Sequence, residues 1–119
     1  MKTVLAFLKK LWVKWLFDKA SHHLCTSFNW RKPPVLIWQD SVTWNIDLNE
    51  LYLSFLYTLE DRKIEVAISD YNTGRHIVKH IRLKDFKPKK FAKELEMELL
   101  GFLLSEGEYD IKDIKDKTI

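Results

Sequence analysis

Residues 63–83, KIEVAISDYNTGRHIVKHIRL, decide the fold because they hold two alternating apolar runs on either side of a turn sequence. The residues that repeat at every second or fourth position are Ile64, Val66 and Ile68 in the first run, and Ile77, Ile81 and Leu83 in the second. This pattern predicts an antiparallel hairpin, closed by a four-residue loop at 72–75 or by a bulge at Gly74. In the predicted register, Ile64 opposes Leu83, Val66 opposes Ile81, and Glu65 opposes Arg82.

The segments before this hairpin predict three more strands. Pro33 and Pro34 impose an extended backbone, after which VLIWQ (35–39) indicates a short strand. A turn at 39–41 then leads into VTWNIDL (42–48), where apolar and polar residues alternate. Residues 51–59 fit both a helical spacing and a two-residue period. We favour a strand, because the turn at 60–62 would lead it directly into the hairpin, and the helix stays open as the alternative.

A helix is predicted at each end of the chain. The stretch TVLAFLKKLWVKWLFDK (3–19) places one apolar stripe, roughly 140° wide, on a helix that should end near Ala20. The members of this stripe are Val4, Leu5, Leu8, Leu11, Trp12, Trp15 and Leu16. We expect it to dock on the core. The second helix should cover 89–104, with Pro88 in its first turn and an apolar face of Phe91, Leu95, Leu99, Phe102 and Leu103.

These elements predict an α+β fold, in which an antiparallel β-meander of four or five strands is flanked by an N-terminal amphipathic helix and a C-terminal helix. Both helices should cover one face of the sheet. We expect one domain over residues 1–107, since 119 residues suffice for a single core, and a flexible acidic tail over 108–119.

Composition and charge restrict the function. The lone Cys25 rules out an intramolecular disulfide and fits a reducing, cytoplasmic compartment. Lys9 and Lys10 interrupt the first apolar run, which argues against a signal peptide and against a membrane-spanning helix. The chain is electrically polarised, because residues 1–35 hold seven basic side chains and one acidic, whereas residues 94–119 hold eight acidic and three basic.

No catalytic or metal-binding pattern stands out. His22, His23 and Cys25 are metal ligands by type, and His76 and His80 would add two nitrogens, but a structural zinc site uses four ligands at characteristic spacings and this chain has one cysteine. The two later histidines would also serve as an acid/base pair, yet no nucleophile or carboxylate accompanies them at a fixed spacing. We therefore expect no enzyme activity, no metal and no cofactor.

Tryptophan is the main indicator of function. Five indoles exceed the need of so small a core, and tryptophan is enriched at protein interfaces. We interpret Trp12, Trp15, Trp30, Trp38 and Trp44 as partner-binding residues. The expected function is a small protein-interaction module, such as a phage or mobile-element accessory protein that binds and inhibits a larger host protein machine.

Two alternative partners remain. Nucleic acid is one, through a basic run at 79–93 that contains His80, Arg82, Lys84, Lys87, Lys89, Lys90 and Lys93. A membrane surface is the other, through the N-terminal helix, because tryptophan and lysine on one amphipathic helix suit the headgroup region. The sequence leaves the identity of the partner and the oligomeric state open.

Overall fold

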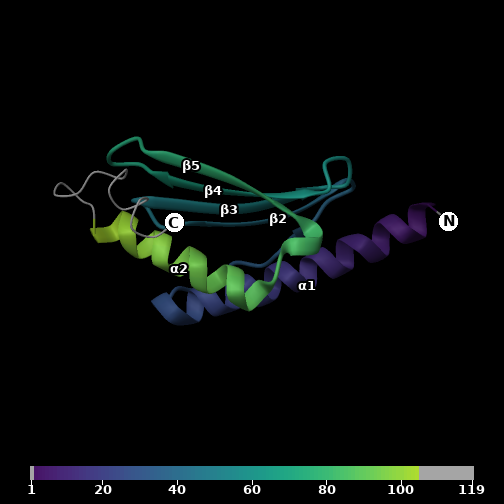
Figure 1. Cartoon of the computed structure of the whole chain (residues 1–119), viewed down its shortest axis with the longest axis horizontal. Helices are drawn as coiled ribbons and strands as arrows, with labels where there is room; N and C mark the ends of the chain where they lie inside the picture. The colour runs from purple at the N-terminus through teal and green to yellow at the C-terminus, as the bar shows by residue number, and fades with distance from the viewer. Residues whose placement is uncertain (1, 105–119) are drawn as a thin grey trace.

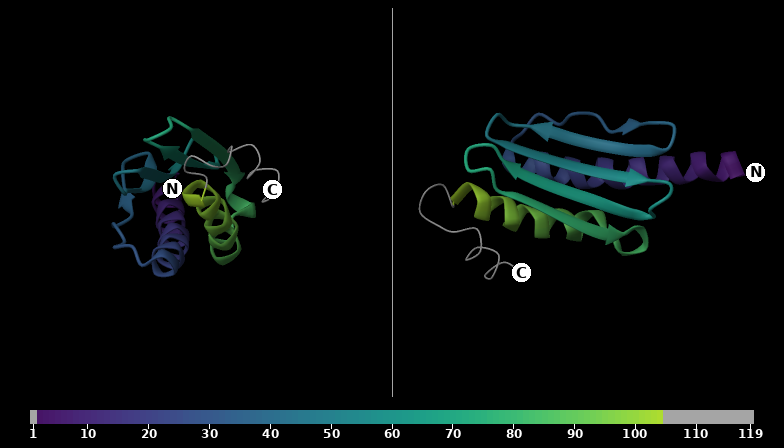
Figure 2. Two further views of the ribbon diagram at one scale, coloured as in Figure 1. Left: turned by 90° about the vertical axis from the view of Figure 1, so that its left-hand side faces the viewer. Right: turned by 90° about the horizontal axis from the view of Figure 1, so that it is seen from above.

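The computed structural model describes residues 2–104 and arranges them as a sheet layer over a helix layer (Figure 1). The elements in chain order are α1 (Lys2–Phe28), β1 (Leu36–Ile37), β2 (Ser41–Asp47), β3 (Leu51–Thr58), β4 (Lys63–Asp70), β5 (His76–Arg82), the 3-10 helix η1 (Leu83–Asp85) and α2 (Pro88–Leu104). The five strands form one antiparallel meander in the order β1-β2-β3-β4-β5. Both helices lie side by side beneath the same face of the sheet (Figure 2). The predicted α+β meander is confirmed, whereas the predicted tail at 108–119 lies outside the described residues.

The core lies between the sheet and the two helices, and Phe55 of β3 is at its centre. Its ring is 4.9 Å from that of Trp44 on β2 and 5.5 Å from those of Phe17 on α1 and Phe91 on α2. Tilted and edge-on ring pairs of this kind contribute about 0.5–1.5 kcal/mol each beyond the area they bury. One side chain thus connects the sheet to both helices.

Residues 51–58 form a strand, so the helical alternative for this segment is wrong. Every second residue of β3 is buried, and the strand pairs with β2 on one side and with β4 on the other. A helix here would have left β2 and β4 without the partner between them.

The hairpin between β4 and β5 has a different register from the predicted one, shifted by two residues. Ile64 opposes Ile81 and Val66 opposes Lys79, so the predicted pairings of these residues with Leu83 and Ile81 are wrong. Glu65 opposes His80 instead of Arg82. The cause is Asp70, whose side chain accepts backbone hydrogen bonds within the loop and whose backbone N–H donates to Arg75, which closes the loop over residues 71–74.

The first helix continues eight residues beyond the predicted end near Ala20. Asn29 has a φ of 58°, and the Trp30 N–H donates to the Cys25 carbonyl over 2.8 Å, which is the 6→1 bond of a Schellman motif. Ser21 does not stop the helix, because its hydroxyl is buried and donates to the Phe17 carbonyl. In the sequence, Asn29 and the apolar Trp30 after it therefore mark the end of the helix.

The helix α1 is longer than the sheet that it supports. Its 27 residues span about 40 Å at about 1.5 Å per residue, whereas the longest strands, of eight residues, span about 27 Å. The difference appears at one end, where the N-terminal part of α1 projects beyond the strands (Figure 1, right). The view from above shows the same projection (Figure 2, right).

Candidate docking surface

The helix α1 has two apolar faces that point in opposite directions. The first, the core face, is buried under the sheet and consists of Val13, Leu16, Phe17, Ala20 and Leu24. The second, the free face, is exposed by 39–64% and consists of Val4, Leu5, Phe7, Leu8, Leu11, Trp12 and Trp15. At 100° per residue, the centres of the two faces are about 155° apart. The free face therefore points away from the sheet.

This arrangement corrects the expectation that the stripe predicted from residues 3–19 docks on the core. Of its seven members, only Leu16 is buried, and the other six belong to the free face. The free face also includes Phe7, which the predicted stripe omitted although it lies one turn before Leu11. Residues 3–19 contain the whole free face but only the first part of the core face. The apolar stripe derived from these residues therefore corresponds to the exposed free face.

The core face ends where charged side chains replace apolar ones. Toward the N-terminus, the positions that continue the core face beyond Val13 are Ala6, Lys9 and Lys10, all half-buried. The Lys10 ammonium donates hydrogen bonds to the carbonyls of Trp38 and Gln39, over 3.0 and 2.9 Å, at the turn between β1 and β2. That turn lies at the end of the sheet beyond which the N-terminal part of α1 projects (Figure 1).

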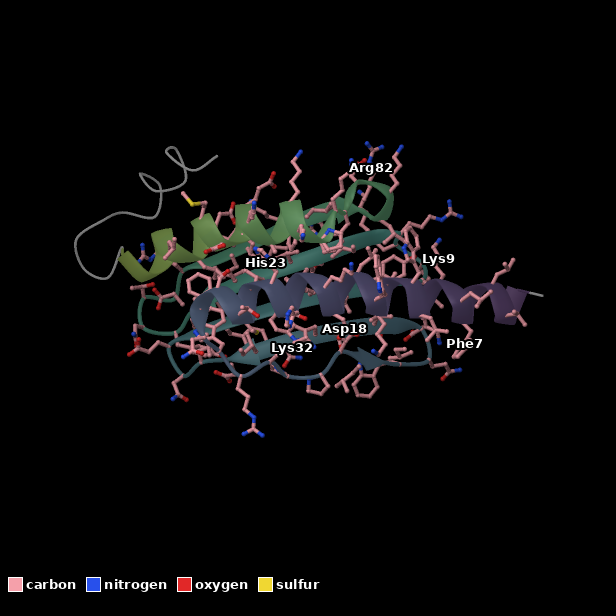
Figure 3. All side chains as sticks on the ribbon, turned by 90° about the horizontal axis from the view of Figure 1, so that it is seen from below. Phe7, Lys9, Asp18, His23, Lys32 and Arg82 are labelled. Atoms are coloured by element: carbon pink, nitrogen blue, oxygen red, sulfur yellow. The ribbon has the colours of Figure 1, made fainter. Side chains whose placement is uncertain are left out.

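The charges around the free face are positive. Lys9, Lys10, Lys14 and Lys19 flank it, and in Figure 3 Lys9 and Phe7 project from opposite sides of α1. The Lys19 ammonium lies 4.5 Å from the centre of the Trp15 ring, a cation–π contact. A docking partner therefore meets an apolar strip bordered by ammonium groups.

Asp18 is the only acidic residue of α1, and two lysines neutralise it. The ammonium groups of Lys14 and Lys32 lie 2.8 and 3.1 Å from its carboxylate oxygens. Partial burial raises the pKa of this carboxyl, but the hydrogen bonds and charges of the two lysines outweigh that effect and leave the pKa below its ordinary value. Two lysines around one carboxylate keep a net positive charge, so Asp18 offsets only part of the positive border of the free face.

The five tryptophans do not form one surface. Trp12 and Trp15 lie on the free face of α1, whereas Trp38 is 53% exposed beside β1 and donates to the Thr43 hydroxyl on the opposite side of the sheet. Trp30 is half-buried and stacks on Phe28 with ring centres 4.5 Å apart. Trp44 is fully buried, and its indole N–H donates to the Pro33 carbonyl, so it serves the core.

The residues of the predicted basic run are exposed but point in different directions. His80 and Arg82 are exposed on β5, Lys84 lies in η1, and four more follow in or just before α2, namely Lys87, Lys89, Lys90 and Lys93. Lys79, between the histidines, instead faces α2, where it forms an ion pair with the buried Glu98. The predicted basic run therefore lies along the exposed surface of β5, η1 and α2, and no single groove contains all of its residues.

The candidate metal ligands stay apart. Among residues 2–104, no group of three or more histidine, cysteine or acidic side chains is arranged to hold a metal ion. His22 is exposed and His23 half-buried on α1, whereas Cys25 is buried. Burial raises the pKa of the Cys25 thiol more than the charge of Lys32 lowers it, which favours the unreactive thiol form.

One pair of side chains has the geometry of a nucleophile and its base. The Ser69 hydroxyl and His76 Nδ1 lie 2.7 Å apart on the exposed face of the sheet. Catalysis by such a pair also needs a group that orients the histidine and donors that stabilise an oxyanion. Among the hydrogen bonds and ion pairs of the described residues, none holds the other nitrogen of His76.

Within residues 2–104, neither helix combines the length and the apolar character needed to cross a bilayer. Comparison of the chain with protein-family models, with curated protein sequences and with solved structures finds no match.

Proposed function

We propose that this protein is a non-catalytic binding module that docks on a partner protein through the free face of α1. The observation that supports this function is the exposure of seven large apolar side chains on a regular helix that extends past its own sheet. Full burial of a side chain of this size contributes about 1.5–3 kcal/mol, so a partner that covers the free face has a large driving force. Contiguous apolar patches of this kind mark interaction sites on soluble proteins.

The spacing on the free face suits a helix-in-groove mode of binding. Val4, Leu8, Leu11 and Trp15 follow the i, i+4, i+7, i+11 pattern that such helices present to an apolar groove. Trp12 and Trp15 are the natural anchors, because buried tryptophans dominate the energetics of many interfaces. The surrounding lysines require a groove with an acidic border. Inhibition of a host protein machine by a phage or mobile-element protein fits this mode and stays a prediction.

The test compares two tryptophans of equal exposure. Trp15 on the free face and Trp38 beside β1 are 51% and 53% exposed, so Trp15→Ala and Trp38→Ala remove similar surface at different places. We expect the full-length protein to retain a specific protein from lysates of candidate hosts, and Trp15→Ala to weaken its binding to that purified protein at least tenfold, as for an interface hot spot. Trp38→Ala should bind normally. Equal binding by both variants and the original protein excludes the free face.

An anionic membrane surface is the second candidate, favoured by the positive charges on both sides of the free face. Tryptophan on the apolar side and lysine at the borders suit a helix that lies in the headgroup region. Sedimentation with vesicles decides between the two functions. Binding to vesicles that contain anionic lipid, absent with zwitterionic vesicles and lost in Trp15→Ala, supports the membrane function. No binding to either kind of vesicle excludes it.

A further inference from the structure

We propose that a second site, a basic groove beside α1, binds a phosphorylated nucleoside unit, either as a free nucleotide or within a single-stranded nucleic acid. The groove has a volume of about 450 Å³ and lies between three segments that are distant in the sequence. Lys9 and Trp12 come from α1, Arg62 and Lys63 from the turn and strand after β3, and Arg82 and Lys84 from the end of β5 and η1. Figure 3 shows Lys9 on the side of α1 that faces the part of the chain carrying Arg82.

The residues that line the groove carry a net positive charge, although most of the groove wall is apolar. Five basic side chains line it against one carboxylate, that of Asp61. Of the five, only Arg82 has an acidic partner within 4.0 Å among the described residues, namely Asp85 at 3.1 Å, and both of these side chains are more than half exposed. Basic side chains without an acidic partner can form charge-assisted hydrogen bonds with a bound phosphate.

The turn that carries Arg62 is held in place beside the groove. Three residues other than glycine have positive φ in the described chain, and two of them are asparagines, which tolerate this conformation. The third is Arg62, with a φ of 58°. Its carbonyl accepts a hydrogen bond from the Leu83 N–H over 3.3 Å, which ties the turn to η1. A left-handed residue is common in a tight turn between strands, and here it belongs to the turn that borders the groove.

The remaining wall indicates that the ligand has a flat apolar part. Trp12 is 47% exposed and borders the groove together with Leu83. Exposed aromatic rings beside basic side chains are the usual arrangement for stacking a base while its phosphate is neutralised. The volume lies within the usual range of small-ligand sites. A phosphate on the basic groups and a base on the indole together define a nucleoside phosphate.

Binding of a fluorescent oligothymidine strand and of ATP to the full-length protein tests the proposal. The key variant is Arg62→Gly combined with Lys84→Gln, because glycine accepts a positive φ and the loss of charge therefore leaves the fold intact. Trp12 borders both surfaces, but neither Arg62 nor Lys84 belongs to the free face, so a loss of binding in this variant is distinguishable from the loss of docking expected for Trp15→Ala. The matched control is Lys89→Gln combined with Lys93→Gln, which removes two exposed charges from α2.

We expect the strand to bind at about 50 mM salt and the groove variant to bind it about tenfold more weakly. The slope of log Kd against log salt concentration should also be shallower by about 1.4 in the variant, because two phosphate contacts are lost. The control should bind almost as the original protein does. Displacement of the strand by ATP identifies a nucleotide-sized site, and failure of ATP to displace it identifies a strand-binding site. The proposal is overturned if neither ligand binds, if the groove variant binds normally, if the control loses as much affinity, or if the groove variant instead loses binding to anionic vesicles.

Discussion

Leu8→Ala and Leu16→Ala should differ sharply in their effect on stability, although the same side chain is shortened in the same helix. Leu16 is 4% exposed on the core face, and its truncation leaves a cavity beneath the sheet, which typically costs about 2.5–5 kcal/mol. Leu8 is 54% exposed on the free face, so its truncation should change stability by less than about 0.5 kcal/mol. Alanine's high helix propensity offsets part of that small loss.

Urea unfolding monitored by circular dichroism measures both effects. With a slope of about 1.5 kcal/mol per molar urea, a loss of 3 kcal/mol lowers the midpoint by about 2 M, whereas 0.5 kcal/mol lowers it by about 0.3 M. Equal losses in the two variants would refute the claim that α1 has one buried and one uncovered face. A midpoint that rises with protein concentration, and does so only while Leu8 is present, would show that a second copy of the chain covers the free face.

Three further predictions concern the core and its border. Lys79→Met leaves the buried Glu98 carboxylate without its cation and should lower the free energy of unfolding by about 3 kcal/mol. Adding Glu98→Leu should restore most of this loss. Additive losses in the double-mutant cycle would show that the two groups are not coupled. Tyr57→Phe removes a buried hydroxyl without a hydrogen-bond partner in the described part of the chain, so the free energy of unfolding should stay constant or rise by up to about 1 kcal/mol, and a marked fall would contradict this. Because the pKa of Asp18 is lowered in the folded state, its stabilising effect is present above its ordinary pKa and is lost as the pH falls through the folded-state value. Thermal unfolding of the original protein and of Asp18→Asn measures this effect. The original protein should be more stable than the variant by under about 1 kcal/mol above the ordinary pKa, and this difference should disappear on acidification. A difference that grows in acid would contradict the prediction.

The meander could be predicted from the sequence because each strand alternates and each turn is short. Residues 51–58 fitted two periods, and the neighbouring strands decided between them, since a strand at this place completes the pairing on both sides. The hairpin register could not be predicted in the same way. A shift by two residues keeps the same side chains on the same face, so the apolar pattern of β4 and β5 fits both registers. The buried Asp70 at the end of β4, which selects one of them, has no distinctive pattern in the sequence.

The residues of the proposed docking surface were recognised from the sequence, but their position relative to the sheet was not. The apolar residues and lysines of α1 were identified, but which face of the helix meets the sheet depends on how far the strands reach, and strand length is a property of the fold. The basic groove was harder still to foresee. Arg82 and Lys84 belong to the predicted basic run, whereas Lys9 and Arg62 join them only after the chain has folded.

The projection of α1 is nevertheless encoded in the sequence, and Lys9 and Lys10 encode it. Both occupy positions that would continue the core face, where an apolar residue would allow the sheet or another segment to cover the helix further toward its N-terminus. Burying two ammonium groups there is unfavourable unless each finds a partner. Lys10 finds carbonyls at the end of the sheet, and Lys9 points into the basic groove. The same two residues thus end the docking of α1 on its own sheet, leave the free face uncovered, and connect it to the groove that we propose as a second site.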